Sequence, residues 1–177
     1  MDEHDDTATQ PDKQEQASND DFPDELIEDE ELDSGYRAIK IESMTAMVSR
    51  MDVSDKIKLA LIGNKEARGL LIKESNKVVV KNVLENPRLT DDEIVVYAGN
   101  KNLAGEVARI ISGKKQFLKS YRVRCALVKN PKTPVPQVMK LMPGLPDHEL
   151  RDIARSTGVA GVVKSTARRL LTQRGRA

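Results

Sequence analysis

One pattern that occurs twice constrains the fold of this 177-residue chain more than any other feature of its sequence. The segment ENPRLTDDEI aligns with KNPKTPVPQV 44 residues later, so that Asn86 falls on Asn130 and Pro87 falls on Pro131. In both copies, one apolar helical pattern precedes the Asn-Pro pair and another follows it. Because the residue before a proline is disfavoured in the α region, each pair predicts the end of one helix and a short break before the next.

Other short helical patterns surround these two copies. Thr90 and Glu93 match a Thr-x-x-Glu capping box, which predicts the start of a helix. The segment LAGEVARII from Leu103 returns as VAGVVKSTA from Val159, at an offset of 56 residues. Since the offset grows from 44 to 56, we expect an additional helix near residues 147–154. Short helical units that cannot bury both faces alone are expected to stack on one another.

The helical patterns predict an all-α protein and leave two architectures open. One is an α-solenoid of stacked short helices, and the other is an irregular helical bundle. Five aromatic residues and no Trp are consistent with a core of packed helices built from Leu, Ile, Val, Met and Ala. Apolar residues from Ile41 to Met51 lie near helical spacing, which predicts a helix before the repeats.

The first part of the sequence and the remainder carry opposite net charges, although the net charge of the whole chain is only +1. Residues 1–34 contain fifteen Asp or Glu and one Lys, and the remainder of the chain carries a net charge of +15. An acidic segment with few apolar residues is typical of a disordered tail. Within it, FPDELIEDEEL could stay solvated or become ordered against a partner or the body. We therefore predict a disordered acidic tail at 1–34, a lead-in helix at 35–52 and an α-helical repeat domain at 53–177.

Basic residues gather later in the chain, where residues 107–146 contain nine Lys or Arg and no Asp or Glu. If residues 115–129 form one helix, four of these cations share one face. A basic stripe with aromatic residues is typical of a surface for nucleic acid or an acidic partner, and also of a solvated face. We further hypothesise that the acidic tail at 1–34 contacts this basic surface in the same chain. The candidate partner-binding residues are Lys115, Lys119, Tyr121, Arg122, Arg124, Lys129, Lys132, Arg168 and Arg169.

The sequence offers little that an enzyme needs. The single cysteine, Cys125, and the two histidines, His4 and His148, argue against a disulfide framework or a Cys-rich zinc site. Neither GxGxxG nor GxxxxGK[S/T] is present. The acids at 91–93 are explained by their place in the first turn of a helix. We therefore expect no catalytic residue, no cofactor and no metal site.

No apolar run approaches the roughly 20 residues that a membrane-spanning helix needs. The first residues, MDEHDDTATQ, are acidic, whereas a secretory signal begins with a basic and then an apolar region. We therefore expect a cytoplasmic protein without a membrane span.

Several segments resemble the HEAT-like and leucine-rich-repeat-variant helical repeats of bacterial proteins. The segments ENPRLTDDEI, KNPKTPVPQV and KNLAGEVARII carry this resemblance. More closely, residues 53–171 resemble an uncharacterised bacterial family with the same repeat character. The resemblance implies a short right-handed α-solenoid and no activity. Because HEAT-like repeats mostly serve as binding surfaces, it implies a non-enzymatic interaction or adaptor protein with a protein partner. A nucleic-acid-binding helical-repeat protein is the alternative.

Overall fold

Helices make up the regular secondary structure of the computed structural model, which describes residues 21–31 and 33–175. These residues form eleven α-helices and no β-strand, which confirms the predicted all-α class. The α-helices are α1 (Asp24–Ile27), α2 (Ser34–Arg50), α3 (Val53–Ile62), α4 (Lys65–Leu71), α5 (Lys77–Val83), α6 (Asp91–Gly99), α7 (Gly105–Gly113), α8 (Tyr121–Lys129), α9 (Val135–Leu141), α10 (Asp147–Arg155) and α11 (Gly161–Gln173). The 3-10 turns η2 (Phe117–Lys119) and η3 (Met142–Gly144) follow α7 and α9.

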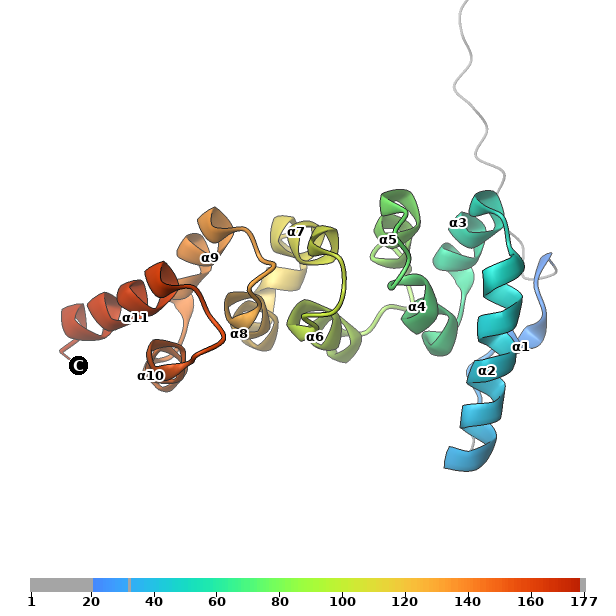
Figure 1. The fold of residues 1–177 in the computed structure, drawn as a ribbon, viewed down its shortest axis with the longest axis horizontal. Helices are drawn as coiled ribbons and strands as arrows, with labels where there is room; N and C mark the ends of the chain where they lie inside the picture. The colour runs from blue at the N-terminus through green and yellow to red at the C-terminus, as the bar shows by residue number, and fades with distance from the viewer. Residues whose placement is uncertain (1–20, 32, 176–177) are drawn as a thin grey trace, which may run out of the picture.

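The helices lie side by side in two rows along the long axis of the molecule (Figure 1). One row contains α3, α5, α7 and α9, and the other contains α4, α6, α8 and α10. Within the rows α3 contacts α5, α5 contacts α7 and α6 contacts α8, while successive helices such as α6 and α7 contact each other between rows. The chain therefore advances from α1 and α2 at one end to α10 and α11 at the other.

The repeated Asn-Pro pair has the same structural role in both copies. The side-chain amide of Asn86 donates to the carbonyl of Ala60 at 2.9 Å, and that of Asn130 donates to the carbonyl of Ala98 at 2.8 Å. Ala60 and Ala98 lie in the last turns of α3 and α6, where backbone carbonyls lack a partner within the helix. Both asparagines are buried. Each therefore fastens an interhelical loop to the end of an earlier helix.

The acidic segment differs from the prediction over residues 21–31. Phe22, Leu26 and Ile27 are buried in the hydrophobic core, and α1 forms around the last two. The buried amide of Asn64 donates to the carbonyls of Glu25 and Glu28 at 2.8 and 2.7 Å. Three apolar side chains and these hydrogen bonds hold the segment on the body despite its charge. Residues 1–20 lie outside the described residues, so the predicted tail stays a prediction there.

Two further helices lie close to their predicted positions. The helix α2 covers the region of the predicted lead-in helix, and α10 covers the predicted additional helix. The capping box is confirmed, because the Thr90 side chain accepts from the Glu93 backbone while the Glu93 side chain accepts from the Thr90 backbone. Across the described ranges, no helix has both the length and the apolar character that a membrane crossing requires.

Candidate functional site

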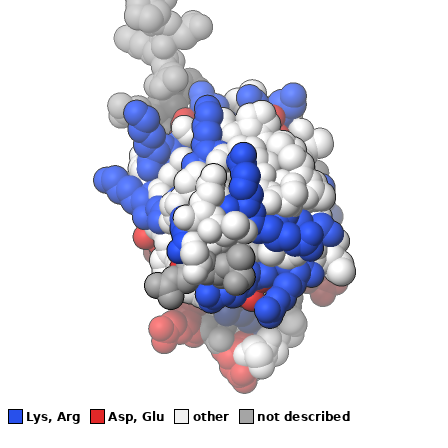
Figure 2. All heavy atoms as spheres, turned by 90° about the vertical axis from the view of Figure 1, so that its left-hand side faces the viewer, with Lys and Arg blue, Asp and Glu red and all other residues white. Residues whose placement is uncertain are grey.

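The charge of the molecule changes sign along its long axis. Residues 21–106 contain eighteen Asp or Glu and twelve Lys or Arg, whereas residues 107–175 contain three and fifteen. Because the helices are stacked in chain order, this difference in sequence becomes a difference between the two ends. Figure 2 shows the end formed by the last helices, where Lys and Arg predominate among the visible charged side chains. A site for an anionic ligand is therefore expected at this end.

A groove of about 800 Å³ lies between α10 and α11. Its lining combines four cations, three hydroxyl groups and two small or aliphatic side chains, and it contains no carboxylate. The cations are Arg151, Arg155, Lys164 and Arg168, the hydroxyl groups belong to Ser156, Thr157 and Thr172, and the remaining residues are Ala154 and Leu171. We refer to this surface as the C-terminal groove.

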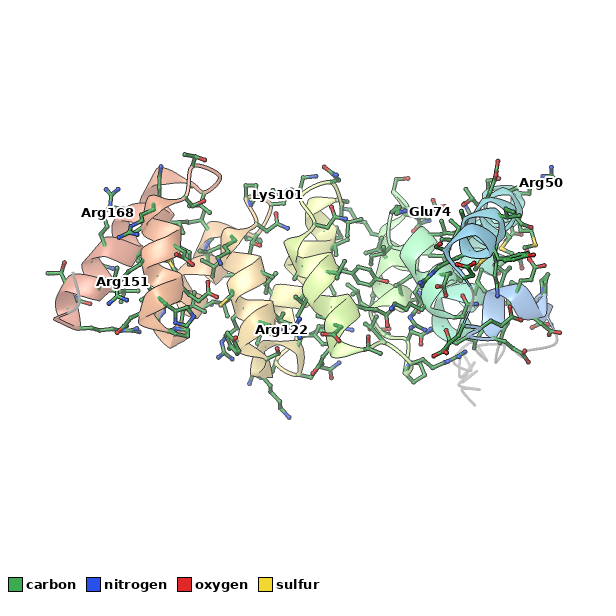
Figure 3. The ribbon with its side chains drawn as sticks, turned by 90° about the horizontal axis from the view of Figure 1, so that it is seen from below. Arg50, Glu74, Lys101, Arg122, Arg151 and Arg168 are labelled. Atoms are coloured by element: carbon green, nitrogen blue, oxygen red, sulfur yellow. The ribbon has the colours of Figure 1, made fainter. Side chains whose placement is uncertain are left out.

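Helical spacing places the four cations in two rows. Arg151 and Arg155 are four residues apart on α10, and Lys164 and Arg168 are four residues apart on α11, so each pair shares one helix face. The apolar faces of α10 and α11 are buried in the core, which fixes the two rows relative to each other. Figure 3 shows Arg151 and Arg168 at this end of the molecule, opposite Arg50.

Most of these cations are not neutralised within the protein. The side chains of Arg151, Arg155 and Lys164 form no ion pair or hydrogen bond with any residue that the structure describes, whereas the Arg168 guanidinium donates to the carbonyl of Ala154 at 3.3 Å. Two of the three acids of α10 pair with other cations: Asp147 with Arg174, and Glu149 with Lys129. The third, Asp152, is exposed and does not line the groove. Like charges gathered in one concave surface create a positive potential that attracts anions. The groove can therefore bind an anionic group without first breaking an ion pair.

The predicted basic stripe is not present, because residues 115–129 do not form one helix. The segment divides into η2 and α8, and the backbone of Ser120 between them is extended, with φ −70° and ψ 123°. An extended residue interrupts the angular spacing of 100° per residue on which the stripe depends. Lys115 and Lys119 are exposed before this break, and Arg122 and Lys129 follow it on α8.

Several of the predicted partner-binding residues have roles inside the fold. Four of the cations contact carboxylates or backbone carbonyls, which lowers their availability to a ligand. The contacts join Arg122 to Asp92 at 2.7 Å, Arg124 to the Leu118 carbonyl at 2.6 Å, Lys129 to Glu149 at 2.6 Å and Lys132 to the Leu103 carbonyl at 2.6 Å.

The remaining candidates are divided between the groove and the open surface. Tyr121 is half exposed at the start of α8, and Arg169 is exposed on α11. Arg168 lines the C-terminal groove, and it is the one candidate that does so. Sequence reasoning missed Arg151 and Arg155, because acidic residues surround them in DHELRDIAR. The signal that identifies them is the i, i+4 spacing of Arg151 and Arg155 followed by the same spacing of Lys164 and Arg168.

The lone cysteine lies within the fold as a small core residue. Cys125 is buried on α8. Burial, and next the charge of Glu149, raise the pKa of its thiol to about 11, although the lysine and arginine nearby act in the opposite direction. The thiol therefore stays protonated at neutral pH, and a thiolate nucleophile is not available.

A buried ion pair joins α4 to α6. The Arg68 guanidinium donates to the two carboxylate oxygens of Glu93 at 2.9 and 2.8 Å and to the carbonyl of Gly63 at 3.0 Å. Burial acts to raise the pKa of Glu93, but hydrogen bonds from Arg68 and Thr90 outweigh it and hold that pKa below its usual value. The hydroxyl of Tyr97 also donates to Glu93, at 3.4 Å. Because both charges are paired, we assign this cluster the role of holding α4 and α6 together.

Within residues 21–31 and 33–175, no group of three or more His, Cys, Asp or Glu side chains is arranged to hold a metal ion. Comparison of the chain with protein-family models, with curated proteins and with solved structures finds no match.

Proposed function

We propose that this protein is a short right-handed α-solenoid of the HEAT-like or leucine-rich-repeat-variant type, acting as a non-enzymatic cytoplasmic interaction or adaptor module. Its C-terminal groove binds a polyanionic partner. The two rows of short helices and the equivalent contacts of Asn86 and Asn130 support the solenoid part of the proposal.

The observation that carries the binding function is the lining of the groove. Four cations face a shared space that no carboxylate lines, and three of them have no partner in the described part of the chain. Hydrogen bonds between ionised partners are roughly twice as strong as those between neutral ones. A ligand whose anionic groups match the spacing of the two rows can form several such hydrogen bonds at the same time.

The lining is also the reason that the proposal assigns no reaction. Asp, Glu, His and Cys, the residue types that serve most often as general acids, bases or thiolate nucleophiles, are absent from the residues lining the groove. A surface composed of cations and hydroxyl groups suits binding of an anion.

The proposal is tested by retention on immobilised heparin, a polyanion without bases or amino acids. We expect the full chain to be retained at about 50 mM salt, and the Arg151→Gln/Arg155→Gln variant to elute at clearly lower salt. The matched control is Arg50→Gln/Lys73→Gln, which removes two exposed cations near the other end. Equal elution of the groove variant and the unmodified chain, or no retention of the unmodified chain, would contradict the proposal.

A further inference from the structure

The chemistry of the C-terminal groove also indicates which class of polyanion it accepts, an inference that rests on the proposed function. We infer that the groove binds the phosphate backbone of a double-stranded nucleic acid without reading its base sequence. Four observations lead to this partner: the polar groups in the lining, the scarcity of apolar anchors, the positions of the aromatic residues and the location of the chain's own acidic segment.

The polar groups in the groove are those that contact phosphate oxygens. Arginine and lysine side chains and serine and threonine hydroxyl groups are among the groups that contact nucleic-acid backbones. The groove combines its four cations with the hydroxyl groups of Ser156, Thr157 and Thr172. Arginine presents a planar set of donors that matches two oxygens of one phosphate. Three of the four cations have no side-chain partner in the described part of the chain, so their donors are available to phosphate oxygens.

The groove lacks the side chains that an acidic protein partner would need. Protein interfaces derive most of their affinity from a few aromatic or aliphatic anchors that fill pockets. The apolar side chains in the lining are Ala154 and Leu171, whose exposed fractions are only 7% and 5%. A polypeptide would find charge in the groove and almost no apolar surface, whereas a phosphate backbone needs only the charge and the donors.

The aromatic residues favour a duplex over a single strand. Proteins that bind single strands stack the unpaired bases on exposed aromatic side chains. Phe22, Tyr97 and Phe117 are buried, and the exposed Tyr36 and Tyr121 do not line the groove. A duplex keeps its bases stacked on each other and presents phosphates outward, so it does not require such a platform.

The described part of the acidic segment does not occupy the groove. Residues 21–31 pack at the opposite end of the molecule, where Asp29 pairs with Arg88 and accepts from the backbone of Lys65. The hypothesised contact between the acidic tail and the predicted basic residues is thus replaced, for residues 21–31, by a contact with α2, α3 and α4. The acidic end also repels a polyanion, so a duplex is steered toward the C-terminal end.

The test measures the affinity of the full chain for fluorescent probes at several salt concentrations. The probes are DNA and RNA duplexes of mixed sequence, their single strands, and polyglutamate with the same number of negative charges. If each groove cation neutralises one phosphate, the logarithm of the association constant falls against the logarithm of salt with a slope of about −3.6. Affinity for a duplex then falls about 100-fold between roughly 50 and 200 mM salt. Two duplexes of unrelated sequence should bind equally.

Substitutions locate the contact. Arg155→Gln and Lys164→Gln should each reduce the size of the salt slope by about 0.9. The control Arg50→Gln removes the same charge at the other end and should leave the slope unchanged. Circular dichroism shows whether each variant keeps its helices, so that a lost contact is distinguished from a lost fold.

The outcomes separate this inference from the proposed function. If heparin and polyglutamate bind as tightly as duplexes of equal charge, through the same residues, the groove binds polyanions generally and the nucleic-acid inference is overturned. Preference for single strands over duplexes also overturns it. If no polyanion binds, the proposed function fails as well. Tighter binding of either duplex, weakened by the groove substitutions alone, supports the inference.

Discussion

Arginine residues are used in opposite ways at the two ends of this molecule. In the N-terminal half, Arg68 makes a two-point contact with Glu93 below the surface, and Arg88 pairs with Asp29. In the C-terminal groove, Arg151 and Arg155 are exposed and have no partner within the described residues. The first pair of arginines holds helices together, whereas the second pair is available to a ligand.

The difference shows that the absence of a partner within the protein, more than the number of cations, indicates a binding surface. The candidate cations on and after α8 occur in a region without acids, yet Arg124 and Lys132 bind backbone carbonyls between helices. The groove arginines occur among acids in the sequence, yet Glu149 pairs with Lys129, Asp147 pairs with Arg174 and Asp152 does not line the groove. A cation bound to a backbone carbonyl loses that contact when it binds a ligand, whereas an unpaired cation has no such contact to lose.

The largest effect is expected from removing the buried carboxylate. Glu93→Gln leaves the charge of Arg68 buried without its partner, and breaking such a pair typically lowers the free energy of unfolding by about 3–5 kcal/mol. Urea denaturation followed by circular dichroism measures this change. Arg151→Gln, an exposed substitution in the groove, should change the same quantity by less than about 0.5 kcal/mol.

Two further measurements test the cause of that loss. Replacing both partners, as Arg68→Met/Glu93→Leu, should recover much of the stability, because no charge is then left buried. The pKa of Glu93 is lower in the folded state than its usual value of 4.5, so the stabilisation is present above that value and is lost as the pH falls through the folded pKa. Acid unfolding should therefore be less steep in Glu93→Gln below about pH 4.5. An equally steep profile would show that Glu93 does not contribute.

A smaller loss is expected at the asparagine that the sequence repeats. Asn130→Ala removes the amide donor to the Ala98 carbonyl and leaves that carbonyl without its side-chain partner, which should cost about 1–3 kcal/mol. Asn86→Ala should cost a similar amount, since its contact with Ala60 is equivalent. The exposed Asn102→Ala is the matched control. If both substitutions prove as mild as the control, the two contacts do not stabilise the stack.

Much of the fold could be predicted from local signals. The capping box follows from the spacing of Thr90 and Glu93, and the Asn-Pro pair marks a helix break, because both effects act within a few residues. The partners of the asparagines could not be predicted, since Ala60 lies 26 residues before Asn86 and Ala98 lies 32 residues before Asn130. Such contacts depend on how the helices stack. The docking of residues 21–31 likewise depends on the surface that α2, α3 and α4 form.

The candidate site was less accessible to sequence reasoning than the fold. A stripe calculated for one helix fails when a single residue, Ser120, is extended. The groove depends on two helices, so its cations are separated in sequence and are mixed with acids that do not line it. Spacing within each helix was visible, but the packing of α10 against α11 determines that the two rows face one groove.

The smallest effect sharpens the comparison between buried and exposed pairs. Arg122 and Asp92 form an ion pair whose side chains are 58% and 79% exposed. Water and salt screen such a pair, so Arg122→Gln should change the free energy of unfolding by at most about 1 kcal/mol, and less at high salt. The measurement is urea denaturation at low and high salt, beside Glu93→Gln. If Arg122→Gln lowered the free energy of unfolding as much as Glu93→Gln, burial would not distinguish the arginines that stabilise the fold from those available to a ligand. In that case the unpaired state of Arg151 and Arg155 would no longer distinguish the groove from the rest of the basic surface.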